Sequence, residues 1–251
     1  MKCLMVALPL IALAACDSAD KATADVAASS SARKLAPAET ASSTAVDAHA
    51  NSIRHLSTQA KMHIAFQKVL DLRVVRERDT KPLAFLETSF GPVLMTGTTM
   101  LGGGKSGYGE FKLHYFQFDG QDGLNYENTY GDIRNYGDYG DLPQWSLDDQ
   151  FADAPTLKFV SATAGNGYGN AWVTLVTINP WGPSESYVPT HAEFYGPNQE
   201  YICEGKISKV EKNVGFEVVV KGTLEFVDKY VFRDGKFVGP KKSQFEDCGP
   251  Q

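Results

Sequence analysis

Short runs of β-branched and aromatic residues, separated by glycine, proline and Asp-Gly pairs, fill the chain beyond Pro82. Such runs are typical of β-strands joined by tight turns. No helical segment separates them, so we expect a mainly β fold, an antiparallel meander that is sandwich- or propeller-like. The expected strands are Leu83–Ser89, Val93–Met100, Glu110–Phe118, Thr156–Thr163, Ala171–Ile178, Tyr187–Tyr195, Gly205–Glu211, Val214–Lys221, Thr223–Arg233 and Lys236–Val238.

Hydrophobic patterning places some of these strands within the sheet. Ala171–Ile178 is apolar on both faces and should be central, whereas Val214, Phe216, Val218 and Val220 alternate with less apolar residues and should be half-buried. The Asp-Gly pairs at 119–120 and 234–235 each follow a tyrosine by four positions and predict hairpin turns, because glycine tolerates positive φ. Two such copies do not establish a repeat.

One N-terminal helix is expected from His49 to about Leu72, where glycine and proline are absent. Its apolar residues form two opposite stripes, which predicts different neighbours at its two ends. Asp47 or Asn51 is expected to cap its start. The following stretch LRVVRERDT is either the end of this helix or a first strand.

The N-terminal stretch MKCLMVALPLIALAACDS has one lysine and then an uncharged apolar run, as export signals do. Leu13-Ala14-Ala15-Cys16 resembles the lipobox of bacterial lipoproteins, and this resemblance covers residues 1–16 alone. It implies that Cys16 becomes lipidated and anchors a periplasm-facing protein to the envelope. Asp17 would then favour the inner membrane. An ordinary secretory signal is the alternative.

Residues 17–48 consist mainly of alanine, serine and threonine and cannot bury a core, so we expect a flexible tether followed by a single domain at 49–251. Without Lys2 the mature chain has 23 basic and 30 acidic side chains, a net charge of −7. This acidity argues against nucleic acid and favours a basic partner.

Three cysteines remain after cleavage of the signal: Cys16, Cys203 and Cys248. With Cys16 lipidated, an even pair is left in an oxidising compartment, which predicts a Cys203–Cys248 disulfide. Two buried free thiols are the alternative.

The stretch from Glu127 to Phe151 combines tyrosines and carboxylates and repeats Tyr-Gly-Asp three times. Aromatic rings supply contact area at low entropic cost, so this stretch is our candidate contact surface for a protein or a sugar. A long irregular loop whose rings fold back onto the sheet is the alternative. The candidate binding residues are Tyr130, Asp132, Tyr136, Asp138, Tyr139, Asp141 and Trp145.

Catalytic and cofactor motifs are missing from the sequence. Leu101–Gly107 lacks the first glycine of a phosphate loop, the five histidines are scattered, and neither a GxSxG nor a CxxC motif occurs. We therefore expect no enzyme, no cofactor and no metal, although a hydrolase that uses two carboxylates stays open. Tyr168 is expected to pack at the end of the sheet, with binding by Tyr168 or Trp181 as the alternative.

Together these features predict a lipoprotein that binds another protein. Its most concrete form is an immunity or inhibitor protein that neutralises an envelope-targeting toxin or hydrolase. The alternative is a carbohydrate-binding or cell-wall maintenance lipoprotein, for which cell-wall saccharide would be the ligand.

Overall fold

The computed structural model describes residues 53–75, 80–99, 109–119, 123–134, 142–197 and 199–248, which lie in one compact unit, Ala45–Gln251. The helical elements are the 3₁₀ helix η2 (Ile53–His55), the α-helix α1 (Thr58–Asp71) and the 3₁₀ helix η6 (Gln244–Asp247). The strands are β1 (Thr80–Thr88), β2 (Gly91–Thr98), β3 (Glu110–Phe118), β4 (Leu124–Arg134), β5 (Gln144–Leu147), β6 (Thr156–Gly165), β7 (Tyr168–Asn179), β8 (Gly182–Tyr195), β9 (Glu200–Glu211), β10 (Gly215–Gly222), β11 (Phe226–Arg233) and β12 (Lys236–Val238).

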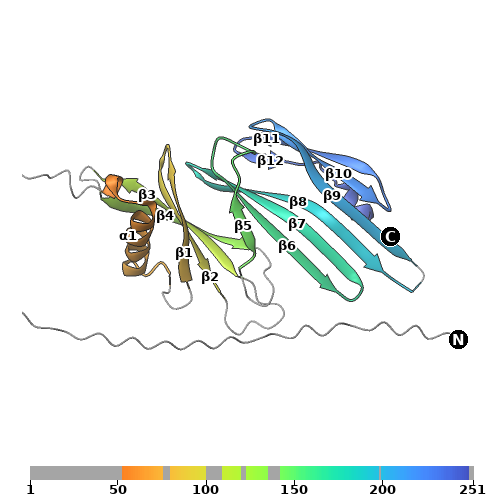
Figure 1. Cartoon of the computed structure of the whole chain (residues 1–251), viewed down its shortest axis with the longest axis horizontal. Coiled ribbons are helices and arrows are strands. Elements are labelled where there is room, and N and C mark those ends of the chain that lie inside the picture. The colour runs from red at the N-terminus through yellow and green to blue at the C-terminus, as the bar shows by residue number, and fades with distance from the viewer. Residues whose placement is uncertain are drawn as a thin grey trace, which may run out of the picture. The chain divides into compact units, whose positions relative to one another are not determined.

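The strands form two antiparallel sheets in which every strand pairs with its neighbours in sequence (Figure 1). Sheet A has the order β1-β2-β3-β4, and sheet B runs from β12 to β5. The predicted fold class, a mainly β meander with one N-terminal helix, is confirmed. One face of sheet A packs against β6 and β7 of sheet B through the core described below.

All ten predicted strands are present, with ends shifted by a few residues. The prediction missed β4 and β5, each of which forms one of the two edges of its sheet. An edge strand exposes much of its surface, so it tolerates the polar and glycine-containing sequences of these two segments. The stretch LRVVRERDT was predicted to be either the end of the helix or a first strand. It does not extend the helix, because α1 ends at Asp71, and its last residue, Thr80, begins β1.

The helix differs from its prediction at its start and in its contacts. It begins at Thr58, where the Ser57 side chain caps it by accepting a hydrogen bond from the Ala60 amide at 3.3 Å. The predicted start at His49 with a cap at Asp47 or Asn51 is therefore wrong. Phe66 and Val69 are buried, whereas Ile64 is exposed, so one face of α1 covers sheet A. The prediction that the two ends of the helix pack against different neighbours is therefore also wrong.

Side chains on the two faces of sheet A belong to two separate hydrophobic cores. Leu94 and Phe116 point toward α1 and, with Phe66 and Val69, belong to the helix-side core. The residues on the opposite face join β6 and β7 in the inter-sheet core, where the rings of Phe111 and Phe159 lie 4.7 Å apart. The buried members of the inter-sheet core are Val93, Met95, Phe111, Leu113, Tyr115, Leu157, Phe159, Val176 and Ile178.

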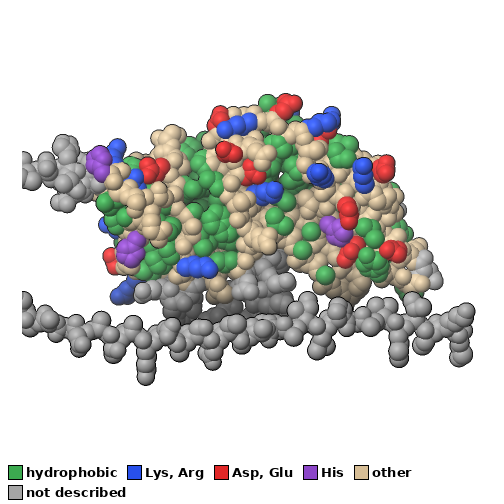
Figure 2. Space-filling model, in the orientation of Figure 1, with side chains coloured by type: hydrophobic (Ala, Val, Ile, Leu, Met, Phe, Trp, Pro, Cys, Tyr) green, Lys and Arg blue, Asp and Glu red, His purple; other side chains and the backbone are tan. Residues whose placement is uncertain are grey.

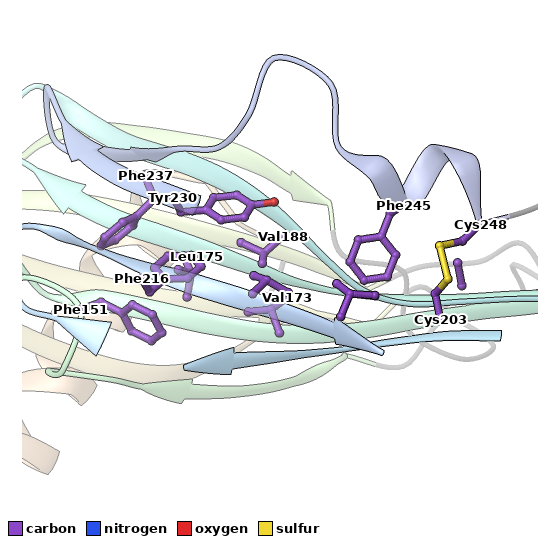
Figure 3. Close-up of a cluster of buried hydrophobic side chains, with 13 residues drawn as sticks. Phe151, Val173, Leu175, Val188, Cys203, Phe216, Tyr230, Phe237, Phe245 and Cys248 are labelled. Carbon is purple, nitrogen blue, oxygen red and sulfur yellow. A yellow bond between two sulfur atoms is a disulfide. The ribbon is translucent and has the colours of Figure 1, made fainter. Parts of the chain in front are cut away.

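Sheet B bends so that β12 lies against β7 and β8 (Figure 1). The Phe237 amide donates to the Ser186 hydroxyl at 2.9 Å and fixes this approach. Aromatic rings fill the space between the two halves of the sheet, and Phe216 and Tyr230 stack there at 4.8 Å (Figure 3). We call this aromatic cluster the C-terminal core.

The bend buries β7 on both faces from Trp172 to Asn179, which confirms the prediction of a central strand. Phe216, Val218 and Val220 are buried in alternation, also as predicted. Val214 is an exception, since it lies in the turn before β10 with 56% of its surface exposed.

The Asp234-Gly235 pair forms the predicted hairpin turn between β11 and β12. Both residues have positive φ, 51° and 73°, as a type I′ turn requires. Asn166 and Gly167 form the corresponding turn between β6 and β7, with φ of 53° and 82°.

The predicted Cys203–Cys248 disulfide is present and joins β9 to the residue that follows η6. It helps to hold the C-terminal segment, which we define as residues 239–248, against sheet B (Figure 3). The Ser243 hydroxyl also donates to the Asp228 carboxylate at 2.5 Å, and the rings of Phe245 and Phe226 meet edge to face at 5.4 Å. Covalent, polar and aromatic contacts therefore all fix this segment.

Candidate functional site

Much of the site predicted from the sequence lies outside the described residues. This applies to the lipidation site Cys16, to Asp17 and the tether, and to the binding candidates Tyr136, Asp138, Tyr139 and Asp141. Asp132 belongs to β4, but its side chain is likewise outside them. For these residues the contact surface stays a prediction.

Tyr130 lies in β4 and is half-buried. Its ring meets the Tyr115 ring edge to face at 4.9 Å, and its hydroxyl donates to the Trp181 carbonyl at 3.2 Å. It also packs on Gly182, whose φ of 122° and lack of a side chain allow the close approach. Tyr130 thus connects sheet A to the turn between β7 and β8.

Trp145 lies in β5, opposite Phe159 of β6. It is half-buried and packs against the inter-sheet core. The rings of Tyr130 and Trp145 therefore fold back onto the sheets, as the alternative interpretation of this stretch described.

Sequence reasoning missed an aromatic ladder at one end of sheet B. Phe194 of β8 pairs with Tyr168 of β7 on one side and with Tyr201 of β9 on the other. The ring centroids lie 4.7 and 6.2 Å apart, respectively. Tyr168 keeps 49% of its surface exposed, so this ladder reaches solvent.

Carboxylates lie at the same end of sheet B, on the face opposite to the ladder. Glu193 and Glu200 raise the pKa of the neighbouring Tyr195 hydroxyl, Glu193 having the largest effect. The Tyr195 hydroxyl donates to Glu193 at 3.4 Å, and the His191 Nε2 atom lies 3.2 Å from the same carboxylate. Figure 2 shows acidic side chains and a histidine among hydrophobic ones over this end of β7–β9. We call this surface the β7–β9 tip: Tyr168, Glu193, Phe194, Tyr195, Glu200 and Tyr201.

A pocket of about 390 Å³ lies beside the tip, between the β7–β8 hairpin and the C-terminal segment. Its aromatic lining comes from Tyr187, Tyr230 and Phe245. Its polar lining comes from Asn170, His191, Lys241, Ser243 and Glu246. These residues are far apart in sequence, so no local motif reveals the pocket.

The prediction that the chain is not an enzyme is wrong, because its premise fails. That prediction was based on the absence of catalytic motifs and on histidines that are scattered along the sequence, away from other catalytic residue types. The structure places the His191 imidazole beside the Glu193 carboxylate, and both His191 and Ser243 line the pocket. A histidine, a carboxylate and a hydroxyl group therefore gather in one region, and missing motifs do not exclude catalysis.

Among the described residues, no helix is both long and apolar enough to cross a membrane. The same residues contain no cluster of three His, Cys, Asp or Glu side chains placed to hold a metal ion. Comparison with protein-family models, with curated proteins and with solved structures found no match.

Proposed function

We propose that this chain is a lipid-anchored, periplasm-facing protein that binds a protein partner through the β7–β9 tip. The partner is a basic toxin or hydrolase that attacks the cell envelope, and binding neutralises it. The anchor is the lipidated Cys16 that the N-terminal resemblance implies. The tether that the composition of residues 17–48 predicts, about 32 residues long, would have a root-mean-square reach of about 30 Å and would let the domain meet its target away from the membrane.

The observation that carries this proposal is the aromatic ladder, in which Tyr168 is exposed and Phe194 and Tyr201 are half-buried. Tyrosine is enriched among the residues that dominate protein interfaces, because its large ring loses little entropy on binding. Tyr168, Phe194 and Tyr201 come from three adjacent strands, so their spacing is fixed by the sheet. A rigid aromatic surface of this kind binds without first having to order itself.

The charge of the tip supports a basic partner. Glu193 and Glu200 are chain neighbours of Phe194 and Tyr201, with their side chains on the other face of sheet B. The mature chain carries a net charge of −7 when Lys2 is removed with the signal. Acidic groups at the rim of an interface accelerate association with a cationic protein. The association rate should therefore fall as salt rises.

The proposal is tested by measuring inhibition of a panel of purified cationic peptidoglycan hydrolases and secreted antibacterial toxins by the mature protein. One member should be inhibited, and Phe194→Ala or Tyr168→Ala should weaken its binding at least tenfold, because each removes an aromatic contact. Isothermal titration calorimetry measures the change.

Trp181→Ala is the matched control, since Trp181 is 64% exposed and lies at the opposite end of the β7–β8 hairpin. It should leave affinity unchanged, and circular dichroism should verify that all variants fold. Failure of every panel member to bind would count against the proposal. So would a partner whose affinity is the same for the tip variants and the wild type.

A further inference from the structure

The pocket beneath the C-terminal segment is lined by a tyrosine, Tyr230, whose ring is buried. Tyr230 is 5% exposed, and its ring is clamped by stacking on Phe216 with an interplanar angle of 5°. No described residue forms a hydrogen bond with its hydroxyl group.

The Tyr230 hydroxyl is accessible from the pocket. Among the described residues, the buried side-chain oxygens that are both sealed from solvent and unpaired belong to Tyr115, Ser161 and Thr177. The Tyr230 oxygen is not among them, and the residue lines the pocket. Figure 3 shows its ring below the arch that joins β12 to η6, with the oxygen directed toward Phe245.

The roof of the pocket is held in place. Gly239 passes so close to the Tyr230 ring that an added Cβ would lie 2.5 Å from the ring atom Cε1. Further along the segment, the Ser243–Asp228 hydrogen bond and the disulfide at Cys248 fix it to sheet B. The pocket is therefore formed before any ligand arrives, which lowers the entropic cost of binding.

The lining offers both hydrogen-bond donors and acceptors. Asn170, Lys241 and Glu246 are exposed and form no hydrogen bond or ion pair with other described residues. Burial, followed by the nearby Asp228 and Tyr187, raises the pKa of the Tyr230 hydroxyl, so this group stays protonated and can donate. The lining carries one cationic side chain, Lys241, and one anionic side chain, Glu246, so their charges offset each other and do not select a charged ligand.

We infer that this pocket binds a neutral saccharide of one or two rings, with the Tyr230 hydroxyl donating to a sugar oxygen. Sugar hydroxyls act as both donors and acceptors, which matches the mixed polar lining. The faces of sugar rings pack on aromatic side chains, and Tyr187, which is 57% exposed, supplies one in the pocket lining. The volume of about 390 Å³ lies in the range of small-molecule sites.

The test uses the mature chain with four probes: glucose, N-acetylglucosamine and the β-1,4-linked disaccharide of each. Saturation-transfer NMR should detect binding of at least one probe, and titration should give its Kd. Tyr230→Phe keeps the ring and removes the hydroxyl, so it should weaken binding about 2- to 12-fold, as loss of one neutral hydrogen bond does.

Tyr115→Phe is the matched control, because it removes another buried, unpaired tyrosine hydroxyl, this one in the inter-sheet core. It should leave the Kd unchanged. Absence of transfer to all four probes would overturn the inference, as would equal affinities of Tyr230→Phe and the wild type. Phe194→Ala, which weakens the proposed protein contact, should leave saccharide affinity unaltered, so the two sites can fail separately.

Discussion

Replacing Cys203 and Cys248 together by alanine is expected to lower the free energy of unfolding by about 3 to 4 kcal/mol. The disulfide closes a loop across a sequence separation of 45 residues, and breaking it gives the unfolded chain more freedom. Both residues are buried, and alanine is tolerated in a buried site better than a polar residue would be. Urea unfolding of the oxidised protein and of the double variant measures the difference.

The reduced wild type provides the control for this experiment. Its stability should approach that of the double variant, because both lack the same covalent link. A loss below about 1 kcal/mol would show that noncovalent contacts hold the C-terminal segment without help. These contacts include the Ser243–Asp228 hydrogen bond and the packing of Phe245 on Phe226.

Acidification from pH 6.5 to pH 4 is expected to destabilise the fold by about 3 kcal/mol through His114 alone. His114 is fully buried, and burial, with a smaller effect of Lys112, lowers its pKa from 6.5 to about 4. Between these two pH values the unfolded chain binds a proton that the folded chain does not. The contribution is therefore fully present above pH 6.5 and is lost as the pH falls toward 4.

Neutral His114 is held between two threonines. Its Nε2 atom lies 2.9 Å from the Thr96 hydroxyl oxygen, and its Nδ1 atom lies 2.7 Å from that of Thr129. His114→Gln retains polar atoms and removes the titration, so stability should depend less steeply on pH in this range. His63→Gln replaces an exposed histidine of α1 and serves as the control. Equal slopes for His114→Gln and the wild type would contradict this assignment.

The strands were predictable because the local pattern and the fold agree at those positions. Alternation along β10 and the continuous apolar run of β7 each match the burial of the strand. β4 and β5 escaped because most of their described side chains are exposed or half-buried, so their sequences show no apolar pattern. The helix start escaped because Ser57 competes with other capping residues, and tertiary contacts decide among them.

The disulfide was predictable from the number of cysteines, once Cys16 was assigned to lipidation and the domain to an oxidising compartment. The tip was not, because Tyr168, Phe194 and Tyr201 become neighbours through strand register, which the sequence pattern does not specify. The pocket was still harder to predict from the sequence. Tyr230 lines it only because sheet B bends and the C-terminal segment crosses the bent sheet. Sites of this kind depend on how elements pack, not on local motifs.

Within each sheet the strands are arranged in the order in which they occur along the chain, and this affects how the protein folds. Each strand finds its partner immediately before or after it, so pairing requires no wait for distant sequence. A chain that emerges N-terminus first can add strands one at a time, and the exposed edge moves along with the growing sheet. Cys248 lies after every strand, so oxidation can lock the assembly only as its final event.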